Sequence, residues 1–454
     1  MKTKVEGGSS LPLIVVLGLA LPTVIALYFY LSYAGRAWFY QDDFGFISQY
    51  AASAQWGQLF DFTNFGRFLS RNGYWHWGIK YFSHNAQYFF IFNFFVISGS
   101  SYLLYKIFEK YGRFEAFVAG LFYFILPATI ESYTWLSNSQ HILGHFFVIL
   151  FVYIFINDDA NNDPVNELFR TLQLVTILVL GFESNIFMSM VLSLPAWMLL
   201  TDKEYRKLKS NYLILVAGIL LFLVFFVKLS GNQQGAYSTA YNFETVRDNL
   251  DYYFKSGSLA VIWFLLIATG SAYSLVRRKY FSAWLFLASA AFFLPFAFFI
   301  HQRYSQYGDL AYLFLLLGIW MVLLDSKIGQ RPDLIRYSGL AMIGLLFLNS
   351  LEPPIRYFSE GPLGAEQKKQ VQFLKVYDSD HPDVKNYCFR SPKQVINTTG
   401  VKEWDIPGEW WAVGFGSAYS LFVSSEKTYE LVQDAKHCDV VFIFNNGRLE
   451  VADH

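Results

Sequence analysis

The chain has 454 residues, of which 54% are hydrophobic, 20% aromatic and only 15% charged. A soluble domain has roughly a quarter of its residues charged, so this composition excludes an ordinary soluble protein. The formal net charge is zero, which gives no sign of a nucleic-acid partner. Several apolar runs reach the roughly 20 residues that cross a bilayer, and they predict an all-α polytopic membrane protein embedded in a lipid bilayer.

The first apolar run covers residues 11–35 and follows Lys2 and Lys4. It is longer than the apolar core of a signal peptide and lacks a convincing small-residue cleavage site, so we expect a retained signal anchor. A polar and aromatic segment, residues 36–87, comes next. This segment is too long for a tight turn and is predicted to be a large external loop.

Ten further apolar runs bring the predicted number of transmembrane helices to about eleven. The pair around Glu183 is read as two helices, because the surrounding Gly, Ser and Asn residues are typical of a tight reversal. The ten runs cover residues 88–105, 116–133, 140–156, 171–182, 184–200, 211–230, 257–276, 281–300, 310–325 and 337–352.

Lysine and arginine are concentrated in alternate loops, and basic loops are retained on the cytoplasmic side. This pattern predicts a cytoplasmic N-terminus, with residues 36–87 and the tail from residue 353 outside. A single helix through Glu183 would place the four-cation loop that begins at Lys203 outside. The charge count therefore favours eleven spans over ten.

The tail, residues 353–454, is predicted to be a small α+β domain outside the membrane module, residues 1–352. We expect a helix over 427–435, then a strand over 440–444, a turn at Asn445-Asn446-Gly447 and a return strand. Cys388 and Cys438, the only cysteines, both fall in the tail. An oxidising exterior would allow a disulfide, but spacing alone is equally compatible with two free thiols.

An acidic pair, Asp42 and Asp43, follows the first predicted helix on the external side. Adjacent carboxylates at a membrane surface repel each other, which costs free energy unless the protein uses them. One of them can act as a base or a metal ligand. The alternative is an ordinary hydrated loop or a helix cap, for which Asp is a preferred residue.

Cations on the same side are candidates for binding an anion. Arg67 and Arg71 are four residues apart and would share a helical face, which suits a phosphate or, alternatively, anchors an interfacial helix to lipid headgroups. His301 and Arg303, followed by Tyr304, lie at the outer end of the ninth predicted helix. They can grip an anion at the interface, or Arg303 can simply extend toward water.

Other ionisable residues give weaker signals. Glu131 and Glu183 are predicted at outer helix ends, where they can support a site or simply be hydrated. His141 and His145 share a helical face, but no third ligand completes a local metal motif, so no metal site is indicated.

The first loop also contains His76 within an aromatic cluster, Tyr74, Trp75 and Trp77. This cluster can stack on an acceptor or form an interfacial belt. The chain has no phosphate-cradling glycine loop, no Gly-x-Ser-x-Gly elbow and no CxxC motif.

Taken together, this arrangement resembles the C-type (GT-C) integral membrane glycosyltransferases. That superfamily includes protein mannosyltransferases and bacterial sugar transferases. The bacterial enzymes modify lipids and the O-antigen of lipopolysaccharide. The resemblance covers the whole chain as an architecture: one helix, a long external loop that begins with the acidic pair, many further helices and an external C-terminal domain. The acidic pair followed by Gly66-Arg67 is most similar to bacterial enzymes that use polyprenyl-phosphate sugar donors. The chain lacks the long soluble domain and the sequon-recognition motif of the oligosaccharyltransferases.

The resemblance implies an inverting hexosyl- or pentosyltransferase in a bacterial plasma membrane, with Asp42 or Asp43 as the catalytic residue. The donor would be a polyprenyl-phosphate-linked sugar and the acceptor a glycan, lipid or protein of the cell envelope. Arg303, Arg67, Arg71 and His301 would then be candidates for the donor phosphate, and Glu131, Glu183, Tyr304 and His76 for site support. No cofactor is required; a divalent metal is compatible with the chemistry but not indicated.

Two other functions share the membrane plan. A transporter or flippase for polar lipids or glycans would place ionisable residues within the helices, and a surface-polysaccharide polymerase would more often carry its large loop later in the chain.

Overall fold

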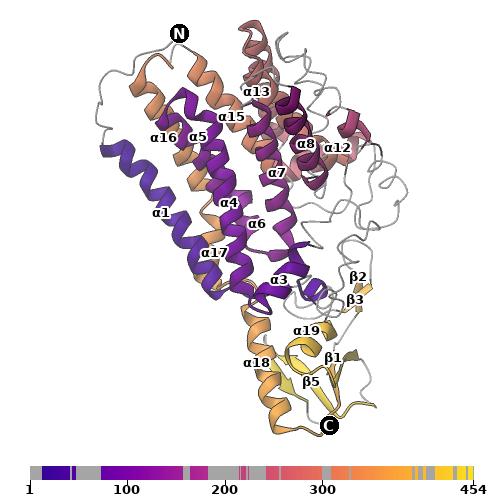
Figure 1. Cartoon of the computed structure of the whole chain (residues 1–454). Coiled ribbons are helices and arrows are strands. Elements are labelled where there is room, and N and C mark those ends of the chain that lie inside the picture. The colour runs from indigo at the N-terminus through magenta and orange to yellow at the C-terminus, as the bar shows by residue number, and fades with distance from the viewer. Residues whose placement is uncertain are drawn as a thin grey trace.

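The described part of the molecule forms a helical bundle with a small sheet at one end (Figure 1). The coarse prediction, a mainly helical chain followed by a small C-terminal α+β region, is thus confirmed. The computed structural model describes residues 13–40, 43–47, 73–156, 164–181, 214, 216–220, 223, 242–254, 257–298, 308–326, 329–390, 394–396, 402–404, 415–432, 437–445 and 448–452.

The helices of the bundle are α1 (Leu13–Arg36), α3 (Tyr74–Phe82), α4 (Ala86–Phe108), η4 (Glu109–Tyr111), α5 (Arg113–Phe124), α6 (Pro127–Tyr133), η5 (Leu136–Asn138), α7 (Ser139–Ile156), α8 (Pro164–Gly181), α12 (Phe243–Phe254), α13 (Gly257–Val276), α14 (Tyr280–Phe293), η6 (Leu294–Phe298), α15 (Asp309–Asp325) and α16 (Pro332–Asn349). Most of the long helices of the bundle coincide with apolar runs of the sequence, whereas α3 and α12 lie outside them.

Five helices in the described ranges are long and apolar enough to cross a membrane, so the chain has the character of a multi-pass membrane protein. The predicted total of about eleven is not confirmed. Of the other predicted helices, α15 has 17 residues, and α8 and α13 contain only the shorter apolar stretches Leu168–Leu178 and Ala260–Val276. Residues 184–200 and most of 211–230 lie outside the described residues. The five are Leu13–Arg36, Ala86–Tyr111, Leu136–Ile156, Tyr280–Phe298 and Pro332–Asp380.

The single helix predicted over 116–133 is instead two helices, α5 and α6, which meet at an angle of 50°. Pro127 is the cause. Its ring restricts Leu126 to an extended conformation (φ −60°, ψ 128°), and it occupies the first turn of α6, where no N–H donor is needed. The pair counts as a sixth candidate span if the bend lies within the membrane.

Tyrosine hydroxyls join α1 to this bend. Tyr30 donates a hydrogen bond of 2.9 Å to the carbonyl of Phe124 at the end of α5, and Tyr133 on α6 donates one of 2.9 Å to the carbonyl of Tyr30. The two rings also pack edge to face, with their centroids 4.7 Å apart. Because carbonyls at a helix break lack intrahelical partners, the Tyr30 hydroxyl satisfies a carbonyl at the end of α5 that would otherwise lack a donor.

The C-terminal region contains a four-stranded sheet of order β4-β1-β5-β6. β1 (Asn386–Arg390) is parallel to β4 (Thr428–Val432) and to β5 (Val440–Asn445), and β6 (Arg448–Val451) is antiparallel to β5. A separate pair joins β2 (Gln394–Ile396) and β3 (Lys402–Trp404). The helices of this region are α17 (Glu352–Glu360), α18 (Ala365–Asp380) and α19 (Phe415–Phe422).

Aromatic residues attach helices to one face of the sheet. Phe442 of β5 packs against Tyr377 of α18, and Phe389 of β1 stacks on Tyr419 of α19. The other face carries a smaller apolar cluster that includes Cys388. The sheet therefore has both faces covered, which is typical of parallel strands.

The helix predicted over 427–435 is wrong, because residues 428–432 form strand β4. Its parallel pairing with β1, in which Asn386 lies opposite Thr428, overrides the local preference. The strand expected over 440–444 and its return strand are confirmed as β5 and β6, with Asn445 opposite Arg448.

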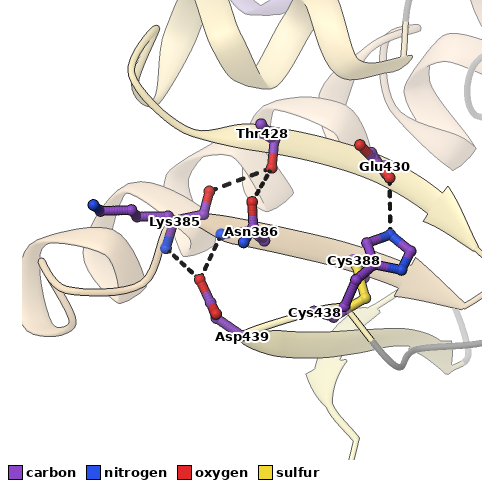
Figure 2. Close-up of a disulfide and its surroundings, with 8 residues drawn as sticks. Lys385, Asn386, Cys388, Thr428, Glu430, Cys438 and Asp439 are labelled. Carbon is purple, nitrogen blue, oxygen red and sulfur yellow. Dashed lines mark hydrogen bonds and ion pairs between the residues drawn. A yellow bond between two sulfur atoms is a disulfide. The ribbon is translucent and has the colours of Figure 1, made fainter.

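The structure decides between the alternatives left open for the cysteines. Cys388 and Cys438 form a disulfide with a Cα–Cα distance of 5.7 Å (Figure 2). It joins β1 to the residues that lead into β5, so it covalently links two strands that are already hydrogen-bonded neighbours.

The described parts of the first loop and of the C-terminal region lie at the same end of the bundle, where α3 approaches α19 and the strands (Figure 1). The ring of Phe422 on α19 packs against Trp38, Phe39 and Phe44, which follow α1. The N–H of Trp38 also donates to the carbonyl of Leu363, at 3.4 Å. Both segments therefore share one side of the bundle, which the predicted topology requires.

Candidate functional site

Asp43 is fully buried at the start of a short helical turn, residues 43–47, that follows α1. Each of its carboxylate oxygens accepts a hydrogen bond: Oδ2 from the backbone N–H of Tyr40 at 2.9 Å, and Oδ1 from the hydroxyl of Ser137 at 2.5 Å. Hydrogen bonds to an ionised carboxylate are stronger than neutral ones, so this pair of donors holds the carboxylate in one orientation.

The connection between α6 and α7 supplies these contacts. Besides Ser137, Trp135 reaches Tyr40: its indole N–H donates to the Tyr40 carbonyl at 3.3 Å, and the two rings pack edge to face. Sequence reasoning did not find Ser137. Its only sequence signal is a run of small polar residues between two apolar helices.

Three buried polar side chains, on α3, α4 and α7, face one another. The hydroxyl of Tyr74 on α3 interacts electrostatically with Asp43 and faces Asn93 of α4 and Ser139 of α7. None of these three side chains is within ordinary hydrogen-bond geometry of a described partner. Burial raises the pKa of the Tyr74 hydroxyl well above its usual value, so it is a hydrogen-bond donor. Buried polar groups are normally bonded, so this set is a candidate location for a polar ligand or water.

A cavity of about 560 Å³ lies between α6, α12, α15, α16 and α17. This volume is within the range of small-molecule sites, and most of its wall is apolar. Its lining residues include Leu315, Leu316 and Leu346, together with the ionisable side chains Glu131, Glu352 and Arg356.

Arg356 is a cation that sequence reasoning did not select. It lies on α17, just after the last apolar helix, and is exposed to solvent as well as lining the cavity. Its position directly after Pro353-Pro354 placed it in the predicted soluble tail. The structure instead packs α17 on the bundle, where Tyr357 donates a hydrogen bond to the carbonyl of Ser32 on α1.

Tyr33 connects the surroundings of Asp43 with those of the cavity. Its hydroxyl donates to the carbonyl of Thr134 at 2.7 Å and accepts from the N–H of Leu363 at 3.2 Å. The same hydroxyl interacts electrostatically with both Asp43 and Arg356. Tyr33 is thus the described side chain through which Asp43 and Arg356 are connected electrostatically.

Two ionisable side chains form a buried pair elsewhere in the bundle. His145 of α7 and Asp309, the first residue of α15, are both fully buried, with 4.0 Å between Nδ1 and Oδ2. The sequence indicates His145 only as a weak metal candidate and gives no signal for Asp309. In the described residues, three metal-ligating side chains converge only at Cys388, His437 and Cys438, and the cysteines there form the disulfide.

Of the residues to which the resemblance assigns a role, Asp43, Glu131 and His76 are described. Asp43 is buried after α1, Glu131 lines the cavity, and His76 is buried on α3, two residues from Tyr74. The others fall outside the described residues: Asp42, Arg67, Arg71, Glu183, His301, Arg303 and Tyr304.

Comparison of the chain with protein-family models and with curated proteins finds no match. The resemblance to GT-C glycosyltransferases therefore stays a hypothesis that depends on the arrangement of the chain and on its candidate site.

Proposed function

We propose that the chain is a GT-C-type glycosyltransferase that moves a sugar, with inversion, from a polyprenyl-phosphate donor to a glycan, lipid or protein acceptor of the cell envelope. The active side would be the outer face of a bacterial plasma membrane. The observation that carries this proposal is Asp43, a fully buried carboxylate that accepts hydrogen bonds from Tyr40 and Ser137 and interacts with the buried hydroxyl of Tyr74.

In the proposed reaction an acceptor hydroxyl attacks the anomeric carbon of the donor sugar. Its proton passes to a carboxylate oxygen of Asp43, the new C–O bond forms, and the bond from the anomeric carbon to the phosphate oxygen breaks. The polyprenyl phosphate leaves with the bonding electron pair. One base within hydrogen-bond reach is sufficient for this chemistry, since the leaving phosphate needs charge stabilisation rather than a proton.

The cavity supports the proposal for the donor. Its leucine-rich wall suits part of an isoprenoid chain, and Arg356 offers paired, charge-assisted hydrogen bonds to a phosphate. The electrostatic interaction of Tyr33 with both Asp43 and Arg356 is consistent with a base and a leaving group at one reaction centre. Arg303, Arg67, Arg71 and His301 stay candidates for the same phosphate, and Asp42 for orienting the acceptor.

The main alternative is a transporter or flippase for a polar lipid or glycan. The observation in its favour is the Asp309 and His145 pair, because ionisable groups buried between membrane helices are typical of proton-coupled transport. Asp43 has no evident role in that alternative.

The test is transfer of radiolabelled sugar from polyprenyl-phosphate donors to a cell-envelope extract by the full chain in nanodiscs. We expect Asp43→Asn to reduce transfer by roughly a hundredfold or more, the usual effect of losing a general base. Asp333→Asn, an exposed carboxylate on α16, is the matched control and should transfer normally. Full transfer by folded Asp43→Asn protein would refute the assignment of the base. Absence of transfer, together with movement of the donor across the bilayer, would favour the transporter.

A further inference from the structure

The Asp309 and His145 side chains form a polar centre deep among α5, α6, α7 and α15. The hydroxyl of Ser132 donates to Oδ2 of Asp309 at 3.3 Å, and the hydroxyl of Tyr123 contacts Nδ1 of His145 at 3.2 Å. Oδ1 of Asp309 and Nε2 of His145 have no hydrogen-bond partner among the described residues. Each ionisable group therefore has an unfilled position that can hold or pass a proton.

Among the described residues, the groups that act on this centre include no lysine or arginine. Glu131, Tyr30, Tyr123 and Tyr312 interact electrostatically with Asp309, and His141 acts on His145. A buried carboxylate without a compensating charge is very costly. The pair is therefore expected to hold one proton at rest and to be neutral overall, whether the proton is on the carboxyl or on the imidazole.

The centre is adjacent to the cavity. Glu131, the neighbour of Ser132 in α6, lines the cavity and interacts electrostatically with Asp309. Tyr312, one helical turn after Asp309 in α15, lines the same cavity. Within α6, Glu131 therefore lines the cavity while its neighbour Ser132 bonds to Asp309.

We propose that Asp309 and His145 form a buried proton-binding site that exchanges protons with the cavity through Glu131. A proton from the cavity first neutralises the Glu131 carboxylate. This proton then moves from Glu131 to the Asp309 and His145 pair. The pair now holds two protons and carries one positive charge, and Glu131 is again a negatively charged carboxylate, so the total charge does not change in the step. This inference does not depend on glycosyl transfer, because it concerns proton binding by the protein alone.

The test is infrared difference spectroscopy of the full chain in nanodiscs, without any sugar donor, during a pH titration. We expect a carbonyl band of a protonated, buried carboxyl group that is lost in Asp309→Asn. Asn keeps an acceptor for Ser132 and has no charge, so the variant should fold. Asp325→Asn, at the opposite end of α15, is the matched control and should keep the band. A band that is the same in all three proteins, or absent from the wild type, would overturn the proposal.

The route through Glu131 is tested by the rate at which this carboxyl proton exchanges in D₂O. We expect Glu131→Gln to slow exchange by roughly tenfold or more, because the relaying carboxylate is lost. An unchanged rate would refute the route. If Asp309→Asn is unstable, His145→Gln provides an independent measurement. This variant should shift the carboxyl band, because the imidazole no longer shares the proton. An unshifted band would show that His145 is not part of the site.

Discussion

The hydroxyl of Ser137 donates a 2.5 Å hydrogen bond to Oδ1 of Asp43 across 94 positions of sequence. This contact joins the α6–α7 connection to the turn after α1, and with the Tyr40 N–H it restrains both oxygens of a buried carboxylate. It makes Ser137 a positioning residue for the proposed base.

Ser137→Ala should reduce sugar transfer by roughly tenfold, because one oxygen of the Asp43 carboxylate loses its donor and its orientation. The expected loss is in kcat, with little change in KM for the donor, and Ser137→Thr should restore most of it because the hydroxyl is kept. The measurement is steady-state transfer in nanodiscs. A loss that Thr does not restore would indicate a packing defect rather than a lost hydrogen bond.

Arg356→Ala should weaken binding of a polyprenyl phosphate to the full chain by roughly tenfold or more, because a charge-assisted contact with the phosphate is removed. Arg356→Lys should recover only part of the affinity, since an ammonium group cannot form the paired contact. Binding is measured by competition with a labelled polyprenyl phosphate. Arg331→Ala, an exposed cation before α16, is the control. Equal affinity of wild type and Arg356→Ala would remove this residue from the phosphate site.

Tyr30→Phe should lower the free energy of unfolding by about 1–3 kcal/mol, because the carbonyl of Phe124 is left buried without its donor. The matched control is Tyr28→Phe, since the Tyr28 side chain is 60% exposed and its ring stacks on Phe358. Both variants are compared by denaturant unfolding in the same detergent. Equal destabilisation by the two changes would show that the bond to Phe124 does not stabilise the bend.

Asp439 should make the stability of the C-terminal sheet depend on pH. Its Oδ2 accepts hydrogen bonds from the backbone N–H groups of Lys385 and Asn386, and these bonds hold the pKa of the carboxyl below its usual value (Figure 2). The Asp439 carboxyl therefore has a lower pKa in the folded protein than in the unfolded chain, where it is about 3.9. Its contribution to the free energy of unfolding is complete above the unfolded pKa and is lost as the pH falls through the folded pKa.

The measurement is the unfolding temperature of the full chain between about pH 6 and pH 2.5, compared with that of Asp439→Asn. The wild type should lose more stability at the acidic end than this variant. Asp383→Asn, an exposed carboxyl group in the same region, should behave as the wild type does. Parallel curves for the wild type and Asp439→Asn would contradict the expectation.

The membrane character of the chain could be predicted from its sequence, because hydropathy depends on contiguous residues. The apolar runs at 11–35, 140–156 and 257–276 correspond to α1, α7 and α13. The β5–β6 hairpin was also predictable, since its strands are neighbours and their turn is local. Asp43 was identifiable as a candidate because an acidic pair directly follows an apolar helix.

Tertiary structure alone decided what depends on distant partners. Residues 428–432 are a strand because β1 lies beside them, and Cys388 meets Cys438 because β1 and β5 are adjacent. Likewise, Arg356 reaches the cavity only because α17 packs on the bundle, and Asp309 meets His145 only because α15 packs near α7. Hydropathy and turn chemistry act over a few residues, whereas these contacts depend on how whole helices and strands pack. Local sequence patterns therefore determined most of the helices and the β5–β6 hairpin, and long-range packing determined the candidate sites.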